Sequence, residues 1–298
     1  MEVNIGISEI EEPVNLDGVR ADFINEKYGN HERNTFDMWL AKSATPTPLV
    51  IYIHGGGFIS GDKSRYYKSE DLMRFLKSGV SVASINYRFM TEEPYGILTC
   101  LNDAKRCLQY IRWNYARYNI DKNRIACSGG SAGAGTALWL AFSDNMADPE
   151  SEDPVMREST RILCAGAFAT QATYDIFKWR QIIGVPVAET PEQLRNIALA
   201  FGIQYVNGSD LSKHEKIRKE LDFLNKMDKN DPPVFIYNKH KGGIPATEDD
   251  LNHHPLHARA IKDKAEEVGL EAVVYAPEIG IVDKSGKDLV EFFLDKFI

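Results

Sequence analysis

Residues 124–133 read Arg124-Ile125-Ala126-Cys127-Ser128-Gly129-Gly130-Ser131-Ala132-Gly133, and good helix formers continue from Ala134 to Phe142. The apolar beginning is typical of a short buried strand, and the G-x-S-x-G pattern that follows indicates a sharp strand-to-helix turn. Glycines are needed on both sides of Ser131, because a Cβ there would collide with the neighbouring strand and helix. We therefore predict that the Ser131 hydroxyl projects at the head of a sheet, beside the N-terminus of a helix.

Strand-like runs alternate with helical patterns on either side of this stretch. Short apolar runs lie at residues 49–53, 80–87, 162–169, 234–237 and 271–275, and helical patterns lie at 69–77, 98–118, 257–268 and from about Lys287 onward. Residues 1–45 are expected to form an N-terminal strand region, because apolar residues alternate there in short stretches. This alternation predicts the α/β class, with a mostly parallel central sheet and helices on both of its faces. At 298 residues we expect a single domain, residues 1–298.

Two segments interrupt the alternation. Residues 144–160 are acidic and broken by proline, which predicts an excursion loop. Residues 176–231, here named the cap segment, separate two core strands by far more than one crossover helix needs, and they hold aromatic and helical material. We interpret both segments as cap or lid material over a site. An ordinary helical excursion with no role in binding is the alternative.

The composition excludes several classes of protein. A formal net charge of −8 argues against nucleic acid as a partner, because phosphate binding needs a basic face. We see no apolar run of about 20 residues and so expect no membrane span. Residues 1–10 lack a basic and apolar leader, so we expect that a signal peptide is absent or has been removed, and we expect a cytoplasmic protein. No nucleotide, flavin or metal motif is visible, and residues 129–133 lack the G-K-[ST] ending of a phosphate loop. We therefore expect no cofactor and no metal.

A second glycine motif follows the strand at residues 49–53. His54 precedes Gly55, Gly56 and Gly57, whose backbone can approach a ligand closely and adopt positive φ. Backbone N–H groups aimed in advance at one point can stabilise a carbonyl oxygen that becomes an oxyanion. Because it ends a strand just before the glycines, His54 is expected to brace this loop rather than to act as a base.

These motifs together resemble the α/β-hydrolase fold, in its hormone-sensitive-lipase-like and carboxylesterase branch. The likeness rests on residues 54–58, 86–88, 102–104, 121–125 and 129–133, within residues 50–142. It implies a lipase-like serine esterase with a helical cap, in which Ser131 is the nucleophile. It also implies an oxyanion hole formed by the N–H groups of Gly56, Gly57 and Ala132. A C-terminal strand and helix often form dimers in this branch, so a homodimer is possible.

The acid of such a triad is expected after the strand at residues 234–237. The loop there is long, and Asp250 is our choice because it lies just before the next helix. Asp249 and Glu248 are close competitors. A charged cluster that only caps a helix is the structural alternative.

The base is expected after the last strand, but that position holds Ile281, and no histidine follows His257. The sequence Asn252-His253-His254-Pro255-Leu256-His257 offers a substitute near the acid. His254 is a plausible base, His253 nearly as plausible, and His240 an outside candidate. A metal site with Asp249 or Asp250, and structural capping, are the alternative interpretations of this cluster.

The leading hypothesis is a serine ester hydrolase that acts through an acyl-enzyme on small-molecule substrates, namely short-chain or carbohydrate-linked esters. Phe58, Tyr66 and Trp179 are expected to shape its pocket. The alternative is a catalytically impaired relative that binds a ligand, because the usual C-terminal histidine is missing. An enzyme should place an imidazole nitrogen within roughly 3 Å of the Ser131 hydroxyl, and a binding protein should not.

Overall fold

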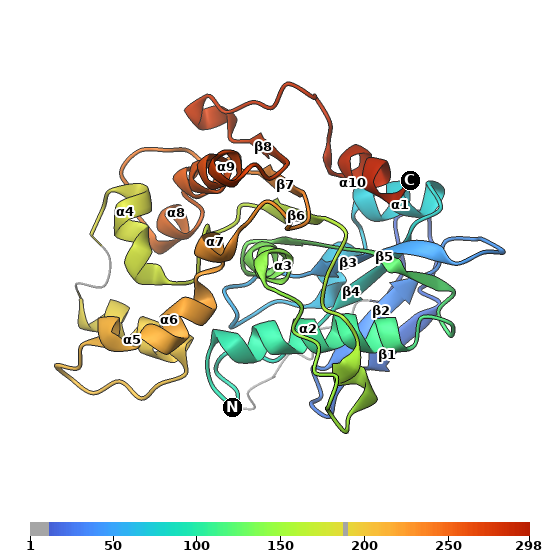
Figure 1. The fold of residues 1–298 in the computed structure, drawn as a ribbon, viewed down its shortest axis with the longest axis horizontal. Helices are drawn as coiled ribbons and strands as arrows, with labels where there is room; N and C mark the ends of the chain where they lie inside the picture. Colours follow the sequence, from blue (N-terminus) through green and yellow to red (C-terminus); the bar gives the residue numbers. More distant parts are fainter. Residues whose placement is uncertain (1–11, 187–189) are drawn as a thin grey trace, which may run out of the picture.

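The computed structural model describes residues 12–186 and 190–298, and its centre is an eight-stranded sheet (Figure 1). The spatial order of the strands is β1-β2-β4-β3-β5-β6-β7-β8. The first two pairings, β1 with β2 and β2 with β4, are antiparallel, and all later pairings are parallel. The strands span Phe23–Lys27 (β1), Thr35–Trp39 (β2), Thr47–Ile53 (β3), Ser81–Ile85 (β4), Ile120–Gly130 (β5), Ala165–Phe168 (β6), Val234–Tyr237 (β7) and Ala272–Tyr275 (β8).

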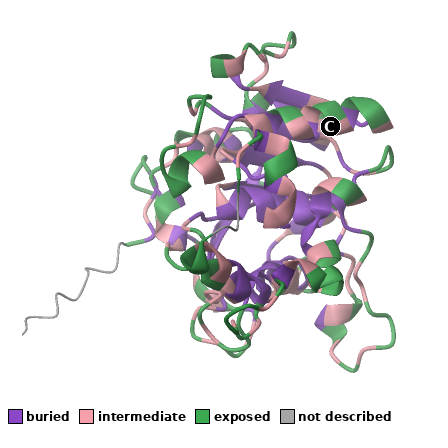
Figure 2. Cartoon of the chain, turned by 90° about the vertical axis from the view of Figure 1, so that its left-hand side faces the viewer, coloured by how far each residue is buried: buried purple, intermediate pink, exposed green. Residues whose placement is uncertain are grey.

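Side chains of the central strands alternate between two apolar clusters, one on each face of the sheet. In β3, Leu49, Ile51 and Ile53 belong to one cluster, and Val50 belongs to the other. Strand β5 repeats the pattern, with Ile125 and Cys127 on the first face. Because both faces are buried, the strands read as nearly continuous apolar runs. Figure 2 shows the buried residues concentrated in this interior, with exposed residues around the periphery.

Helices cover both faces, as the α/β-hydrolase expectation requires. On the first face lie α2 (Ile97–Trp113), α3 (Ala132–Phe142) and α9 (Leu256–Val268). On the second lie α1 (Glu70–Lys77) and α10 (Leu289–Phe297), whose apolar residues join the second cluster. The predicted fold class is confirmed. Among the described residues, no helix combines the length and the apolar character needed to cross a bilayer.

The two excursions take different places in the fold. Within residues 144–160, the short 3-10 helix η2 (Pro154–Arg157) lies along α2, where the Gln109 amide donates to the carbonyls of Met156 and Glu158. That position is beside α2 and not over Ser131. The cap segment holds α4 (Trp179–Ile183), α5 (Pro191–Phe201), α6 (Glu215–Leu221) and α7 (Phe223–Lys226), together with η3 (Ile176–Lys178) and η4 (Leu211–Lys213).

A close contact between two glycines fixes α5 to the body of the fold. Gly202 ends α5 with φ +69°, and a Cβ there would lie 2.3 Å from the Tyr95 carbonyl oxygen. Gly96 precedes α2 with φ +103°, and a Cβ there would lie 2.7 Å from the Gly202 nitrogen. Only glycine fits both positions without displacing backbone. The helix is therefore held against the start of α2.

Candidate active site

Ser131 lies at the turn between β5 and α3, as predicted. Its φ of 52° and ψ of −119° are a strained combination for a residue with a side chain. A Cβ on Gly133 would lie 1.9 Å from the Ile53 carbonyl oxygen, and one on Gly129 would lie 2.6 Å from the same atom. These glycines let β3, β5 and α3 approach closely enough to hold the turn.

The glycine loop after β3 lies against this turn. A Cβ on Gly55 would be 2.6 Å from the Gly130 carbonyl oxygen, while Gly56 and Gly57 have φ of +122° and +60°. Gly57 and Ala132 line the same cavity as Ser131. Ala132 is the first residue of α3, where N–H groups have no acceptor within the helix. Two of the three candidate oxyanion donors, Gly57 and Ala132, are thus near the serine.

His54 occupies the bracing position expected of it. Its fully buried ring stacks on Tyr87, with centroids 4.3 Å apart, and its Nδ1 lies 2.8 Å from the Gly55 carbonyl oxygen. Burial lowers the pKa of His54 to about 4, so the ring is neutral at pH 7 and donates to that carbonyl.

The imidazole that reaches the serine belongs to His253. Its Nε2 lies 2.7 Å from the Ser131 Oγ, and its side chain is 15% exposed. His253 directly follows the five-residue helix α8 (Glu248–Asn252). The chain thus supplies an imidazole from the segment after β7, in place of the missing one after β8.

Asp249 is the carboxylate on the other side of this ring. Its Oδ1 lies 2.9 Å from the His253 Nδ1, four residues away, and its side chain is 71% exposed. Although this contact is short, the buried Nδ1 has no aligned hydrogen-bond acceptor among the described residues. The interaction is therefore mainly electrostatic, with the carboxylate off the N–H direction.

Asp250, our first choice for the acid, has a different position. Its Oδ2 accepts hydrogen bonds from the Thr247 hydroxyl and from the Ala246 and Thr247 N–H groups, which lower the pKa of its carboxyl. Its own N–H donates to the Thr247 hydroxyl, completing a capping box. Asp250 thus caps the N-terminus of α8, which is the structural role that the capping alternative predicted. Glu248 lines the cavity from the same helix.

His254, our first choice for the base, is directed elsewhere. Its Nε2 lies 2.9 Å from the Gly243 carbonyl oxygen, and its Nδ1 accepts from the Leu256 N–H. These bonds tie the loop after β7 to the beginning of α9. The structure brings His253 to Ser131, and it gives His254 a structural position.

Three buried polar residues hold α8 in place. The Asn238 amide donates to the His253 carbonyl at 3.0 Å, and the Gln171 amide donates to the Asn252 carbonyl at 2.8 Å. His257, fully buried, accepts from the Ala172 N–H and lies 3.2 Å from the Leu251 carbonyl oxygen. The sequence does not predict these anchors, because polar residues that meet only in the folded chain leave no local pattern.

The environment of His253 keeps its ring neutral. Burial is the largest effect and lowers its pKa, Asp249 opposes it, and the charge of His240 lowers the pKa further. The His240 and His253 rings are stacked, with centroids 4.9 Å apart and planes at 29°. A neutral imidazole at pH 7 is the form that can accept a proton from Ser131.

The cavity beside Ser131 has a volume of about 330 Å³. Of the residues expected to shape it, Phe58 and Trp179 line it, the latter from α4 in the cap segment. Tyr66 does not: it stacks on Tyr52 at 3.9 Å, in the cluster on the opposite face of the sheet. Amide side chains also line the cavity, from Gln171, Gln193, Asn196 and Asn252.

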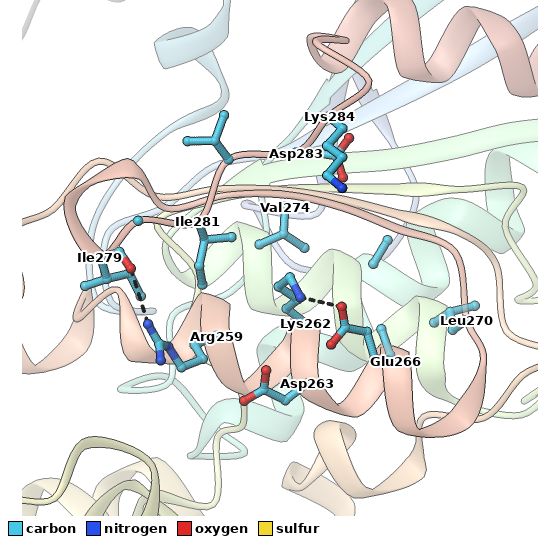
Figure 3. Close-up of a pocket in the computed structure, with 14 residues that line it drawn as sticks. Arg259, Lys262, Asp263, Glu266, Leu270, Val274, Ile279, Ile281, Asp283 and Lys284 are labelled. Carbon is cyan, nitrogen blue, oxygen red and sulfur yellow. Dashed lines mark hydrogen bonds and ion pairs between the residues drawn. The ribbon is translucent and has the colours of Figure 1, made fainter.

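A larger groove, of about 640 Å³, is lined by Ile281, the position at which the family resemblance leads one to expect the base. Figure 3 shows Ile281 directed toward α9, above Arg259, whose guanidinium donates to the Ile279 carbonyl at 3.3 Å. Ile281 also forms a bridge with Ala276. The residues lining this groove and those lining the Ser131 cavity do not overlap, so Ile281 has no part in the candidate site.

The sheet order and the serine turn define the α/β-hydrolase fold. A protein-family model, BD-FAE, matches residues 36–245, and the chain belongs to this family. A solved truncated carbohydrate esterase from gut microbiota has a similar fold, with a TM-score of 0.68 and 18% identity over 92% of this chain and 95% of that one.

Curated relatives are similar over parts of their length. Gut esterase 1 of Caenorhabditis elegans is 26% identical over 66% of this chain and 33% of its own length. Esterase LipC of Mycobacterium tuberculosis is 23% identical over 70% of this chain and 48% of its own length. The chain thus spans less than half the length of each of these two relatives.

Proposed function

We propose that this protein is a serine ester hydrolase in which Ser131 is the nucleophile and His253 the general base. The observation that carries the proposal is the distance of 2.7 Å between the Ser131 Oγ and the His253 Nε2. A ligand-binding relative without a base would lack this contact. The names of the similar proteins, Gut esterase 1 and Esterase LipC, support the same class of reaction.

The proposed reaction follows from the positions of these groups. Ser131 Oγ attacks the ester carbonyl while its proton passes to His253 Nε2, and the alkoxide that develops receives N–H bonds from Gly56, Gly57 and Ala132. His253 then protonates the departing alcohol, leaving an acyl group on Ser131. Water, deprotonated by the same ring, then attacks the acyl carbon, and the ring returns the proton to Ser131 Oγ as the acid leaves. Asp249 stabilises the imidazolium that forms in each step.

The cavity supports small esters as substrates. Its volume, about 330 Å³, lies at the lower end of the range for ligand sites and suits a short acyl chain. Its apolar residues fit such a chain, while the amides of Gln171, Asn196 and Asn252 can bond to hydroxyl groups. We therefore propose short-chain or carbohydrate-linked esters as the substrate class, with the cap segment forming one wall.

The experiment is the hydrolysis of p-nitrophenyl acetate by the wild type and by Ser131→Ala, His253→Gln and His254→Gln. We expect losses in kcat of at least about 10³-fold for the first two variants, because each removes a member of one proton-transfer unit. His254→Gln should retain most of the rate, since its ring contacts loop backbone. Serine-independent turnover would favour the ligand-binding alternative, and an inactive, folded His254→Gln beside an active His253→Gln would reverse the base assignment.

A further inference from the structure

The face of His253 that points away from Ser131 belongs to a second group of side chains. His240, Asp249 and His253 each offer a ligand atom, and these atoms all lie within 4.8 Å of one another. The residues come from the loop after β7, from α8 and from the position directly after α8, and they are separated by at most 13 positions in the sequence. Two imidazoles and one carboxylate are a common set of protein ligands for zinc, with a fourth position left to water.

We propose that His240, Asp249 and His253 bind Zn²⁺, and that zinc switches the serine off by occupying the Nδ1 atom of His253. The binding site stands on the geometry of the three side chains alone. The switch rests also on the proposed function, because it needs His253 to act as the base of Ser131.

The arrangement favours a metal for two reasons. The His253 Nδ1 is buried and lacks an aligned hydrogen-bond partner among the described residues, so a cation there would satisfy an atom that Asp249 only approaches. The His240 and His253 rings are stacked, with centroids 4.9 Å apart, which places two imidazoles beside the Asp249 carboxylate.

Binding requires only a small closure of the group. Tetrahedral zinc with bonds of about 2.0–2.1 Å holds its ligand atoms roughly 3.3 Å apart. The pair His253 Nδ1 and Asp249 Oδ1 is already 2.9 Å apart. Asp249 is 71% exposed and His240 is half-buried, so both can rotate toward a common centre.

Zinc on Nδ1 would reverse the role of His253. In the active form Nδ1 carries the proton and Nε2 accepts from Ser131. With Nδ1 bound to the metal, the proton of the neutral ring moves to Nε2, with no net loss of a proton. The Nε2–H group then donates to Ser131 Oγ and cannot accept its proton. Asp249 is engaged at the same time, so the imidazolium also loses its neighbouring carboxylate.

The experiment measures zinc binding and reaction rate separately, on the full chain stripped of metal with EDTA. Zinc affinity is measured by competition with a chromophoric chelator, and the rate is that of p-nitrophenyl acetate hydrolysis. The variants are His240→Gln, Asp249→Asn and, as a matched control, His214→Gln, an exposed histidine outside the group. Mg²⁺ is the control ion, because it prefers oxygen ligands.

We expect one zinc per chain, an affinity lowered roughly tenfold or more in His240→Gln and Asp249→Asn, and no change in His214→Gln. The rate of the wild type should fall in parallel with zinc occupancy and return with EDTA, whereas Mg²⁺ should have no effect. Equal zinc affinity in the wild type and His240→Gln would overturn the site. Stoichiometric binding without a slower reaction would overturn the switch.

The chelator assay separates this proposal from the proposed function. If the metal-free protein shows no serine-dependent hydrolysis, the esterase proposal and with it the switch fail. Zinc binding that depends on His240 and Asp249 would still support the metal site in that case.

Discussion

The His253 ring lies between the Ser131 hydroxyl and the Asp249 carboxylate, and the two contacts differ in alignment and in exposure to water. The bond to Ser131 is short, while the carboxylate of Asp249 is exposed and off the N–H direction. An exposed ion pair is screened by water and contributes little compared with a buried one. We therefore infer that Ser131 and His253 carry most of the rate, with Asp249 in a supporting position.

The pH dependence of hydrolysis tests this inference. Protonated His253 cannot accept the serine proton, so activity should rise with pH to a plateau, with a midpoint below the ordinary histidine pKa of 6.5 because burial lowers the pKa. Asp249 raises the pKa, so Asp249→Asn should move the midpoint to lower pH. His240 lowers it, so His240→Gln should move the midpoint to higher pH.

The measurement is kcat/KM for p-nitrophenyl acetate between pH 4.5 and 8.5, in buffers that contain EDTA. We also expect Asp249→Asn to retain activity at the plateau within about 10- to 100-fold of the wild type, since its contact is exposed. Midpoints that do not move apart in these two variants would contradict the assignment of His253 as the titrating group.

Among the elements, the serine turn depends on the close approach of β3, β5 and α3. We predict that Gly133→Ala destabilises the protein by at least about 3 kcal/mol, because the new Cβ would lie 1.9 Å from the Ile53 carbonyl oxygen. Gly130→Ala is the matched control, since a Cβ there meets only the Tyr52 hydroxyl, at 3.7 Å. Urea unfolding compares the two, and equal loss of stability would contradict the packing argument.

The cap segment yields a prediction about substrate size. Ile197 of α5 lines the cavity and is buried, so Ile197→Ala should enlarge the cavity by part of a side chain. We expect the rate for p-nitrophenyl hexanoate relative to acetate to rise about tenfold, as a few methylene groups gain room. Ile183→Ala in α4 is the control, because Ile183 is buried but does not line the cavity. An equal change of this ratio in both variants would indicate a general loosening.

Local patterns predicted the strands and the serine turn, because each is encoded by neighbouring residues. The run at residues 234–237 matches β7 at both ends, and α3 begins at Ala132 as the glycine pattern indicates. The base was harder to predict, since its position depends on anchors such as Asn238 and Gln171 that are distant in sequence.

The helix α8 shows what the sequence did contain. Thr247 and Asp250 have the spacing of a capping box, which marks the start of a helix and gives Asp250 a structural role. In a helix that begins there, Asp249 and His253 are four residues apart and share one face. This spacing was the available signal for the pair that lies beside Ser131.

For the whole molecule, two buried histidines predict a stability that falls in acid. The pKa of His54 is lowered to about 4 and that of His257 to about 3, in both cases mainly by burial, while the unfolded value is about 6.5. The unfolded chain therefore binds more protons below pH 6.5. The contribution of the two neutral histidines to the free energy of unfolding is fully present above this pH. It is lost as the pH falls toward the pKa values of the folded protein, by about 1.4 kcal/mol per pH unit for each histidine.

The measurement is urea unfolding at pH 7.5, 6.0 and 5.0, for the wild type and His257→Asn. The variant lacks one of the two buried imidazoles, so its unfolding takes up about one proton fewer in acid. Its free energy of unfolding should therefore fall less steeply with decreasing pH than that of the wild type. At pH 7.5 we expect the variant to be the less stable protein. Parallel curves for the two proteins would show that His257 is not kept neutral by the fold.

Asp249 lies in α8 and His253 directly follows that helix, four residues later, while Ser131 lies at the turn after β5. A single displacement of this five-residue segment would therefore separate hydroxyl from imidazole and leave the rest of the fold intact. The same arrangement makes the pair transferable: residues 247–253 form a short cassette, and protein engineers could graft it onto a related sheet that has lost its C-terminal histidine.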